Sequence, residues 1–180
     1  RSGFDWLDGG EGDDLIYGGS EDDVILGGDG SDRLYGEAGD DYIAVGAGSN
    51  YNDSQFERGA WGGDGNDTLV AGGSRSLLRG ENGDDLIILS QSSSAWSRYI
   101  GGSGVDTLSF ERFNVGININ IGALGNSSGS SGWQTFSGHQ HFVQFENFTA
   151  TEFDDTLTGD DQNNVLRGLD GDDHLNGGGY

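Results

Sequence analysis

Several residue types on which small stable domains rely are scarce or missing in this sequence. The 180 residues include no cysteine, which excludes a disulfide framework and a thiolate metal site. There is no proline, and glycine follows no strict three-residue period, so a collagen triple helix is excluded. Only 32% of the residues are hydrophobic and the net charge is −23, a balance typical of disordered chains. A folded state therefore needs a source of stability besides an apolar core.

Positive charge is also scarce. Eight Lys and Arg residues stand against 31 Asp and Glu residues, so few side chains could meet nucleic-acid phosphates or an anionic membrane surface. No apolar run is long enough to cross a bilayer as a helix, and the sequence shows no N-terminal signal peptide. We therefore expect neither nucleic acid nor membrane insertion among the partners.

Glycine, in contrast, is abundant, with 36 residues, many of them in a nine-residue repeat. Four units follow one another without a spacer from Gly9 to Ala44 and read GGEGDDLIY, GGSEDDVIL, GGDGSDRLY and GEAGDDYIA. Each unit begins with glycine and has an aliphatic residue at its eighth position. A period this strict is the signature of a repeat architecture. The sixth position of each unit is an aspartate, namely Asp14, Asp23, Asp32 and Asp41.

Each unit combines a turn with a very short strand. Glycine permits tight turns with positive φ, and the last three residues alternate polar, aliphatic and polar. Such a strand is unstable alone, but stacked copies bury a continuous aliphatic seam. Stacking also aligns the aspartates, and two carboxylates about 4 Å apart repel by roughly 4 kcal/mol at an effective dielectric constant of about 20. Because Ca²⁺ binds both carboxylate and carbonyl oxygens, the repeat predicts several calcium ions between successive turns.

The repeat resembles the RTX, or hemolysin-type, calcium-binding nonapeptide, whose pattern is G-G-x-G-x-D-x-U-x. The resemblance implies an all-β parallel β-roll (a right-handed β-solenoid) of stacked nonapeptide turns with calcium in the turns, interrupted here by irregular insertions. Two units form one coil, so each unit lies above the unit two places later. Each Ca²⁺ is then expected to bind the second- and fourth-position carbonyls and the aspartate of one turn. The next turn adds its first- and third-position carbonyls and its own aspartate.

The resemblance also assigns ligands residue by residue. The expected aspartate pairs are Asp5 with Asp23, Asp14 with Asp32, Asp23 with Asp41, Asp67 with Asp85, Asp85 with Asp106, and Asp155 with Asp173. The glycine carbonyls expected as further ligands belong to Gly10, Gly12, Gly18, Gly19, Gly27, Gly36, Gly63, Gly65, Gly80 and Gly168. The other expected carbonyl ligands belong to Ser20, Glu21, Asp29, Ala38, Asn82, Thr151, Phe153 and Asp170. The site at Glu21 requires that this residue adopt the turn conformation of a glycine.

We expect one β-roll domain over residues 1–180, with repeat blocks at 1–44, 62–109 and 150–180. An irregular turn at 45–61 separates the first two blocks, and we expect Phe56 and Trp61 to close the core there. Residues 110–149 are expected to form a non-repeat, aromatic-packed strand pair with a loop, because residues 115–121 alternate apolar and polar.

Several positions depart from the repeat. An insertion at 89–100 interrupts the second block, so Asp106 can stack on Asp85 only if the insertion loops out. Ser76 and Asn164 replace the sixth-position aspartate, and we expect calcium to be lost beside Ser76 and weak or absent beside Asn164. The fifth-position acids recur with the repeat, which favours a solvated or turn-capping role over acid–base catalysis. They are Asp13, Asp22, Asp40, Asp84, Asp154 and Asp172.

Two histidines, His139 and His141, would share one face of a strand. Such a pair can bind a transition metal, but a packed or surface pair is the expected role. No HExxH motif occurs, and no recognisable base and orienting group accompany the serines of the 89–100 insertion, so we predict no catalytic residue.

Three hypotheses about function follow. The favoured one is a calcium-binding module of a secreted or cell-surface bacterial protein that folds on calcium outside the cell; the resemblance also implies type I secretion. The second is an adhesin, surface-layer or matrix segment that uses calcium-dependent assembly, with Trp96 or Trp133 contacting a surface or glycan. The third is the non-catalytic repeat tail of a secreted enzyme. Both ends break a repeat unit, so we expect a fragment of a longer polypeptide or a processed chain, with neighbouring domains as partners.

Overall fold

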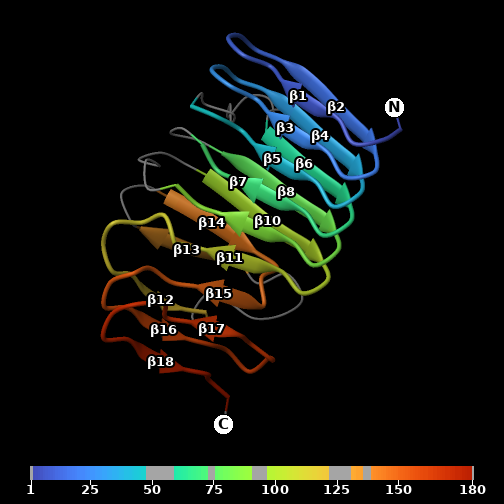
Figure 1. The fold of residues 1–180 in the computed structure, drawn as a ribbon. Coiled ribbons are helices and arrows are strands. Elements are labelled where there is room, and N and C mark those ends of the chain that lie inside the picture. Colours follow the sequence, from blue (N-terminus) through green and yellow to red (C-terminus); the bar gives the residue numbers. More distant parts are fainter. Residues whose placement is uncertain are drawn as a thin grey trace.

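The computed structural model describes residues 2–47, 59–72, 76–90, 97–121, 131–135 and 139–179. Within these ranges every helix or strand element is a β-strand, which confirms the predicted all-β class. The strands stack into an elongated roll with the first coil at one end and the last at the other (Figure 1). The described part of the chain has no helix long and apolar enough to cross a membrane.

The described strands form three sheets. In spatial order, an eight-stranded sheet contains β1 (Trp6–Asp8), β3 (Val24–Leu26), β5 (Tyr42–Ala44), β7 (Thr68–Val70), β9 (Leu86–Ile88), β11 (Thr107–Ser109), β15 (Asn147–Thr149) and β17 (Leu166–Arg167). A seven-stranded sheet contains β13 (Ser131–Thr135), β14 (His139–Val143), β10 (Ser97–Ser103), β8 (Leu77–Asn82), β6 (Gly59–Asp64), β4 (Arg33–Ala38) and β2 (Leu15–Ser20). The third sheet contains β12 (Asn118–Asn120), β16 (Thr156–Thr158) and β18 (His174–Asn176). Among these strands, β13 and β14 pair antiparallel and the other paired strands run parallel.

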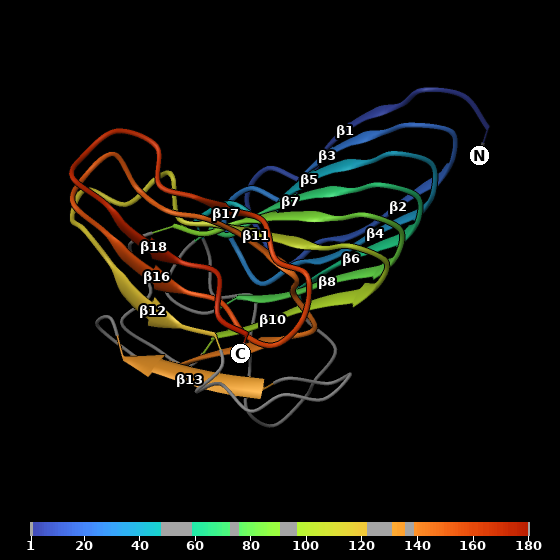
Figure 2. The same ribbon diagram turned by 90° about the horizontal axis from the view of Figure 1, so that it is seen from below.

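Successive coils of the first block are in register at a spacing of two nonapeptides. Leu7 pairs with Ile25, and Ile25 pairs with Ile43, in the eight-stranded sheet. Ile16 pairs with Leu34 in the seven-stranded sheet. Alternate units therefore enter alternate sheets, and these sheets lie one above the other in Figure 2, joined by the turns. This arrangement is the predicted parallel β-roll.

The eighth-position aliphatic residues form the core. Ile25, Leu34 and Ile43 are completely buried, and Leu69 and Leu78 continue the line beyond the first interruption. Each unit contributes one such side chain, so the core of the repeat blocks is narrow.

Beyond β11 the core becomes aromatic. Phe110 packs edge-on against Phe113 and Phe142, with ring centroids 5.4 Å and 5.9 Å apart. The alternating stretch is shorter than its sequence pattern: β12 covers three residues, and Ile117 is buried whereas Val115 is 52% exposed.

The structure corrects the prediction for Trp61. Strand β6 already begins at Gly59, and buried Ala60 takes the core position that was expected for Trp61. Trp61 pairs in register with Tyr35 and points outward, because successive residues of a strand point to opposite faces. Phe56 and Trp96 lie outside the described residues.

Candidate calcium sites

The turns repeat one backbone conformation. In the unit that begins at Gly9, Gly10 and Gly12 have φ values of 88° and 117°, in the region that favours glycine. The same second and fourth positions have positive φ in units that lack glycine there. Glu21 has a φ of 73° and Leu169 a φ of 71°. Glu21 thus adopts the conformation that its expected site requires.

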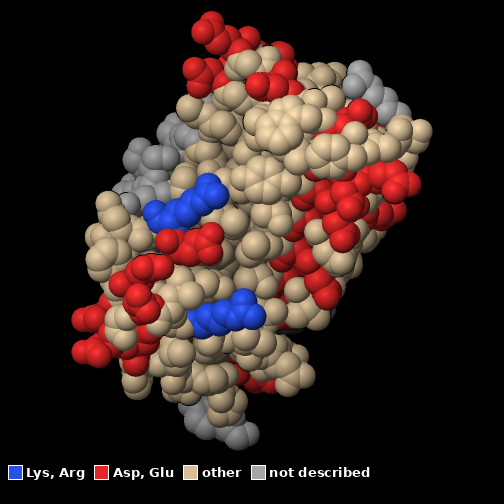
Figure 3. All heavy atoms as spheres, viewed as in Figure 1, with Lys and Arg blue, Asp and Glu red and all other residues tan. Residues whose placement is uncertain are grey.

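The turns follow two edges of the roll. The continuous edge consists of the turns that lead from the seven-stranded to the eight-stranded sheet: Gly18–Asp23, Gly36–Asp41, Gly62–Asp67, Gly80–Asp85 and Gly101–Asp106. The interrupted edge begins with the turns Gly9–Asp14 and Gly27–Asp32, and beyond them the chain leaves β5, β7 and β9 on this side and returns in β6, β8 and β10. Acidic side chains form a broad area beside the ends of β4, β6 and β8, where the continuous edge lies (Figures 1 and 3). In the described part of the chain, regular turns therefore follow the continuous edge without a break, whereas on the other edge only the first two turns are regular.

On the continuous edge, each sixth-position aspartate binds the coil before it. Oδ1 of Asp23 accepts the backbone N–H of Asp5 at 2.7 Å. The same bond, at 2.7 to 2.9 Å, is made by Asp41, Asp67, Asp85 and Asp106. Asp106 therefore does stack on Asp85, and the row also joins Asp41 to Asp67, a pair that the repeat spacing did not predict.

The second carboxylate oxygen of these side chains is buried beside the first glycine of its own turn. A Cβ on Gly18 would lie 2.6 Å from Oδ2 of Asp23 and 2.7 Å from the carbonyl oxygen of Gly36 in the next coil. Oxygens from two coils thus converge on a space too small for a methyl group. Within the described ranges, Oδ2 has no hydrogen-bond partner in Asp14, Asp23, Asp41, Asp67, Asp85 and Asp106.

The first two turns of the interrupted edge have the same geometry. A Cβ on Gly9 would lie 2.7 Å from Oδ2 of Asp14 and 2.5 Å from the carbonyl oxygen of Gly27. Oδ1 of Asp32 accepts the N–H of Asp14 at 3.0 Å. Beyond this point the pattern is lost, because the N–H of Ser76 donates to the hydroxyl of Ser97 at 3.2 Å instead of to a carboxylate.

Burial raises the pKa of the aspartates on the continuous edge. The pKa rises from 3.8 to about 6 for Asp41 and Asp85, and to about 7 for Asp67 and Asp106. Loss of hydration is the largest cause. The backbone N–H of the preceding aspartate lowers each pKa, and neighbouring acids raise it again. Without a cation the ionised row is therefore unfavourable.

The donor set suits calcium, because Ca²⁺ takes six to eight oxygen ligands from carboxylates and carbonyls. Among the described residues, no group of three or more His, Cys, Asp or Glu side chains could hold a metal, so a cation here must also use the backbone. The carbonyls of Gly10 and Asp29, two expected ligands, each accept one backbone N–H at 2.7 Å. A carbonyl oxygen has a second lone pair, so these bonds leave room for a cation.

The last block differs at Asp155. Its Oδ1 accepts the N–H of Ile117 at 2.6 Å, and its Oδ2 accepts the N–H of Thr151 at 2.8 Å. The hydroxyl of Thr151 adds bonds to both oxygens. Thr151 therefore meets this carboxylate through its donors, whereas its carbonyl was the expected calcium ligand. Asp173 keeps the regular pattern, since its Oδ1 accepts the N–H of Asp155 at 3.0 Å and its Oδ2 lies beside Gly168.

Asn164 takes the place of an aspartate near the end of the roll. Its side-chain oxygen accepts the N–H of Asp160 at 2.9 Å, and its side-chain nitrogen donates to the carbonyl of Glu146 at 2.9 Å. An asparagine can thus donate a hydrogen bond to the carbonyl oxygen of the adjacent coil. An aspartate cannot, so it leaves that oxygen to a cation.

The fifth-position residues form a separate ladder. Oδ1 of Asp40 accepts the N–H of Asn66 at 2.7 Å, and Oδ1 of Asp84 accepts that of Val105 at 2.9 Å. Asp13, Asp22 and Asp154 make equivalent bonds. These bonds lie at the surface, where each fifth-position acid links its own turn to the backbone of the next coil.

His141 lies half-buried in β14. Loss of hydration and the charge of Arg98 both lower its pKa. Nothing in the described residues gathers further metal ligands around it, so a metal at His139 and His141 gains no support.

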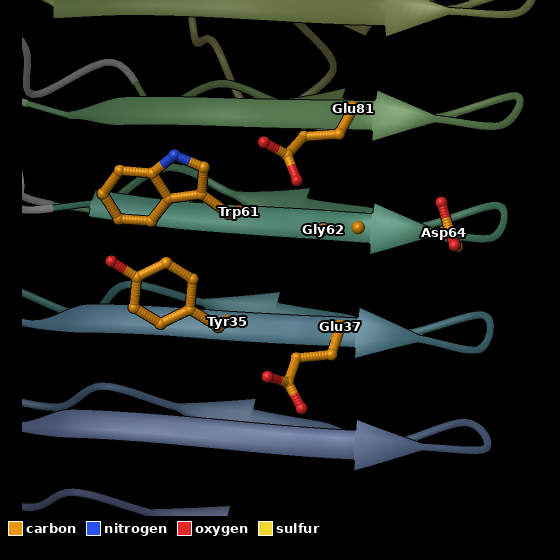
Figure 4. A pocket seen from close by; sticks show the side chains of 7 residues that line it. Tyr35, Glu37, Trp61, Gly62, Asp64 and Glu81 are labelled. Atoms are coloured by element: carbon orange, nitrogen blue, oxygen red, sulfur yellow. The ribbon is translucent and has the colours of Figure 1, made fainter.

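Trp61 belongs to a stack of rings on the outer face of the seven-stranded sheet. The centroids of Tyr35 and Trp61 are 4.8 Å apart, with an angle of 15° between the rings. Beside them a hollow of about 220 Å³ lies over Gly62, with Glu37 and Glu81 on either side (Figure 4). Gly62 and Gly63, which line the hollow, have no side chains to fill it.

The parallel roll and its rows of carboxylate and carbonyl oxygens define a calcium-binding solenoid. A family model for the RTX calcium-binding nonapeptide repeat matches the chain in four copies, at residues 1–25, 17–51, 61–91 and 149–179. A search of curated proteins found no match. The matched residues make up more than half of the sequence, so the chain belongs to the RTX calcium-binding repeat family. The nonapeptides of this family bind several calcium ions and occur in secreted bacterial proteins.

Proposed function

We propose that this chain is a module that calcium folds outside the cell, and that the continuous edge holds most of the ions. Each ion would bind the Oδ2 atom of one sixth-position aspartate and backbone carbonyls of two successive coils. Asp14 and Asp32 would hold ions on the interrupted edge. The sites expected from the sequence at Asp155 and Asp173 stay part of the proposal, with Asp155 the weaker because Thr151 already binds it.

The single observation that carries this proposal is the buried Oδ2 atom repeated along the continuous edge. A buried oxygen without a partner is costly unless an ion or a donor meets it. In this row the carbonyl of the next coil approaches the same point, as Gly36 does beside Asp23. Two acceptor oxygens cannot form a hydrogen bond with each other, but a cation can bind both.

Magnitudes explain why calcium would control folding. At a calcium concentration of about ten times Kd, each site stabilises the folded chain by about 1.4 kcal/mol. Several sites together reach the total stability of an ordinary domain, about 5–15 kcal/mol. Extracellular sites of this kind have Kd values of about 10⁻⁴ to 10⁻³ M. A chain with a narrow core and a net charge of −23 would then be unfolded at cytosolic calcium levels and folded outside the cell.

The test is far-UV circular dichroism in EGTA and then in millimolar Ca²⁺, with a calorimetric titration to count the ions. We expect an unfolded spectrum in EGTA and a β spectrum in calcium. Magnesium is the matched control, because it prefers a smaller octahedral site and gives up its water reluctantly. A chain that is fully folded in EGTA, or that magnesium folds equally well, would contradict the proposal.

A second candidate is calcium-dependent assembly, favoured by the first coil. Phe4 and Trp6 are each 66% exposed, Leu15 is 54% exposed and Tyr17 is 49% exposed. Trp6, Leu15 and Tyr17 lie on β1 and β2, and Phe4 lies just before β1. In the described part of the chain β1 and β2 are the last strands of their sheets, and such edge strands can pair with a further strand. Light scattering in calcium separates the two readings: a monomer favours the isolated module, and ordered oligomers favour the assembly.

A catalytic role would belong to other parts of a parent protein. One formal match to the G-x-S-x-G pattern, GNSSG at 125–129, lies in a Gly/Ser-rich stretch outside the described residues. That motif acts at a turn from a strand to a helix, and the described part of the chain contains no helix.

A further inference from the structure

The turn that follows β14 takes the place of a repeat turn, although its sequence is not a nonapeptide. In the pairing of β11 with β15, Thr107 lies opposite Asn147. The N–H of Asn147 donates to the carbonyl of Asp106 at 2.9 Å, as the N–H of Thr107 does to that of Asp85 at 2.8 Å. Glu146 therefore occupies the position that a sixth-position aspartate has in the other coils.

The carboxylate of Glu146 also makes the bond that such an aspartate makes. Its Oε2 accepts the backbone N–H of Asp106 at 2.8 Å. One coil earlier, Oδ1 of Asp106 accepts the N–H of Asp85 at 2.9 Å. The row on the continuous edge thus continues from Asp106 to Glu146.

The length of the turn explains why a glutamate is found here. Ile100 pairs with Val143, so Gln144 lies opposite Gly101. The stretch Gln144–Glu146 then spans the gap that Gly101–Asp106 spans in the coil before, with half as many residues. The extra methylene of glutamate supplies reach that the shorter turn does not. Gln144 has a φ of 59°, the left-handed conformation of the repeat turns.

The space between these two turns has the features of the other sites. Asp106 is completely buried, and its Oδ2 has no hydrogen-bond partner in the described part of the chain. A Cβ on Gly101 would collide with that Oδ2 and with the carbonyl oxygen of Gln144. The side chain of Gln144 donates to the carbonyl of Gly102 at 3.1 Å and holds the turn in place.

We propose an additional calcium site between Gly101–Asp106 and Gln144–Glu146. Oδ2 of Asp106, the carbonyl of Gln144 and the carboxylate of Glu146 would bind the ion. The half of the site formed by Gln144–Glu146 lies outside the nonapeptide pattern, and the family model does not match residues 92–148. It would make calcium the link between the second repeat block and the non-repeat strands β14 and β15. The inference rests on the proposed calcium-dependent folding of the module.

The experiment compares Glu146→Gln with Glu111→Gln by calorimetric calcium titration of the full chain. Both variants remove one negative charge, but Glu111 is exposed, and its backbone N–H donates to the hydroxyl of Ser109 two residues before it. Glutamine at 146 keeps an oxygen for the N–H of Asp106, so the fold should persist in saturating calcium. We expect Glu146→Gln to bind one calcium ion fewer than the wild type, and Glu111→Gln to bind the wild-type number. Glu146→Asp should also lose the ion, because its side chain is too short.

Hydrogen exchange on the wild-type chain provides a measurement that needs no variant. We expect the amides of Asp106 and Asn147 to become protected when calcium is added and to stay exposed in magnesium. An unchanged ion count in Glu146→Gln, or amides of Asp106 and Asn147 that stay unprotected in calcium while those of Asp41 and Asp67 become protected, would overturn the additional site. A wild-type chain that binds no calcium at all would instead overturn the proposed function, so the two failures are distinguishable.

Discussion

The substitution Asp85→Asn tests whether a cation stabilises the carboxylate row, because its effect on stability should change sign with calcium. Asparagine has nearly the shape of aspartate and keeps an oxygen for the N–H of Asp67, which Asp85 accepts at 2.8 Å. The substituted amide would lie beside Gly80 and the carbonyl of Gly101 and could donate to it. Asn164 makes a bond of this kind to Glu146 in the native chain. The variant should therefore fold without strain.

The magnitude follows from the pKa of Asp85 and from the loss of an ion. A pKa of about 6 in place of 3.8 corresponds to about 3 kcal/mol against the ionised calcium-free fold, and solvent in the turns reduces this to roughly 1–2 kcal/mol. Asparagine removes that cost, so the calcium-free fold should gain about this much. In calcium at about a hundred times Kd, losing one site removes about 2.7 kcal/mol. After the gain in the calcium-free fold is subtracted, the variant should be less stable than the wild type in calcium by about 1–2 kcal/mol.

The matched control is Asp84→Asn, the adjacent residue with the same change of charge. Asp84 is exposed, and asparagine can still accept the N–H of Val105. Its effect should stay below about 0.5 kcal/mol in both conditions. Unfolding by urea measures the calcium-bound state, and folding in EGTA driven by trimethylamine N-oxide measures the calcium-free state. If Asp85→Asn destabilised both states, or if Asp84→Asn had equal effects, the reasoning about the buried row would be refuted.

Three further predictions concern space, protons and the core. Gly62→Ala should weaken calcium binding and lower stability in calcium, because its Cβ would collide with Oδ2 of Asp67 and the carbonyl of Gly80. The control is Gly72→Ala on the interrupted edge, which introduces similar crowding without an aspartate nearby. Calorimetric titration compares the calcium affinity of the two variants. The aspartates with pKa values of about 6 to 7 hold protons in the calcium-free fold that the unfolded chain releases near pH 4, so the calcium-free fold should lose stability as pH rises through about 6 to 7. Calcium must displace these protons, so its affinity should rise over the same range, and titrations in two buffers should detect proton release; a pH-independent affinity would contradict this. Leu78→Ala should cost about 2–5 kcal/mol in calcium by urea unfolding, whereas exposed Leu15→Ala should cost little.

The regular parts of the roll could be predicted from the sequence because the repeat is local. Nine residues determine the turn, the strand and the position of one aspartate, so Asp23 and Asp41 could be paired by counting. Pairings across irregular stretches could not be counted in this way. Asp41 lies 26 residues from Asp67, and only the pairing of β5 with β7 shows that the coil closes normally.

Other positions depended on side-chain geometry. The N–H and hydroxyl of Thr151 satisfy Asp155, which the one-letter pattern of a calcium site cannot reveal. Glu146 takes an aspartate position in a shortened turn, and the signal was present in the stretch QFENFT, where an acid precedes a polar–apolar–polar triplet as in the repeats. The prediction for Trp61 was wrong because the sequence predicted no strand at this point, so the alternation of inward and outward side chains along β6 could not be used to place it.

The different character of the two edges explains how one chain combines a strict repeat with long insertions. A coil remains in register as long as one of its two turns is fixed, because the strands on both sides follow from that turn. On the continuous edge, hydrogen bonds from Asp5 to Glu146 fix one turn of every coil. The other connections can then be longer in the sequence, as between β5 and β6 and between β9 and β10, or can have Ser76 in place of an aspartate. Substitutions on the continuous edge should therefore disturb coils on both sides of the altered turn, whereas changes within the insertions should remain local.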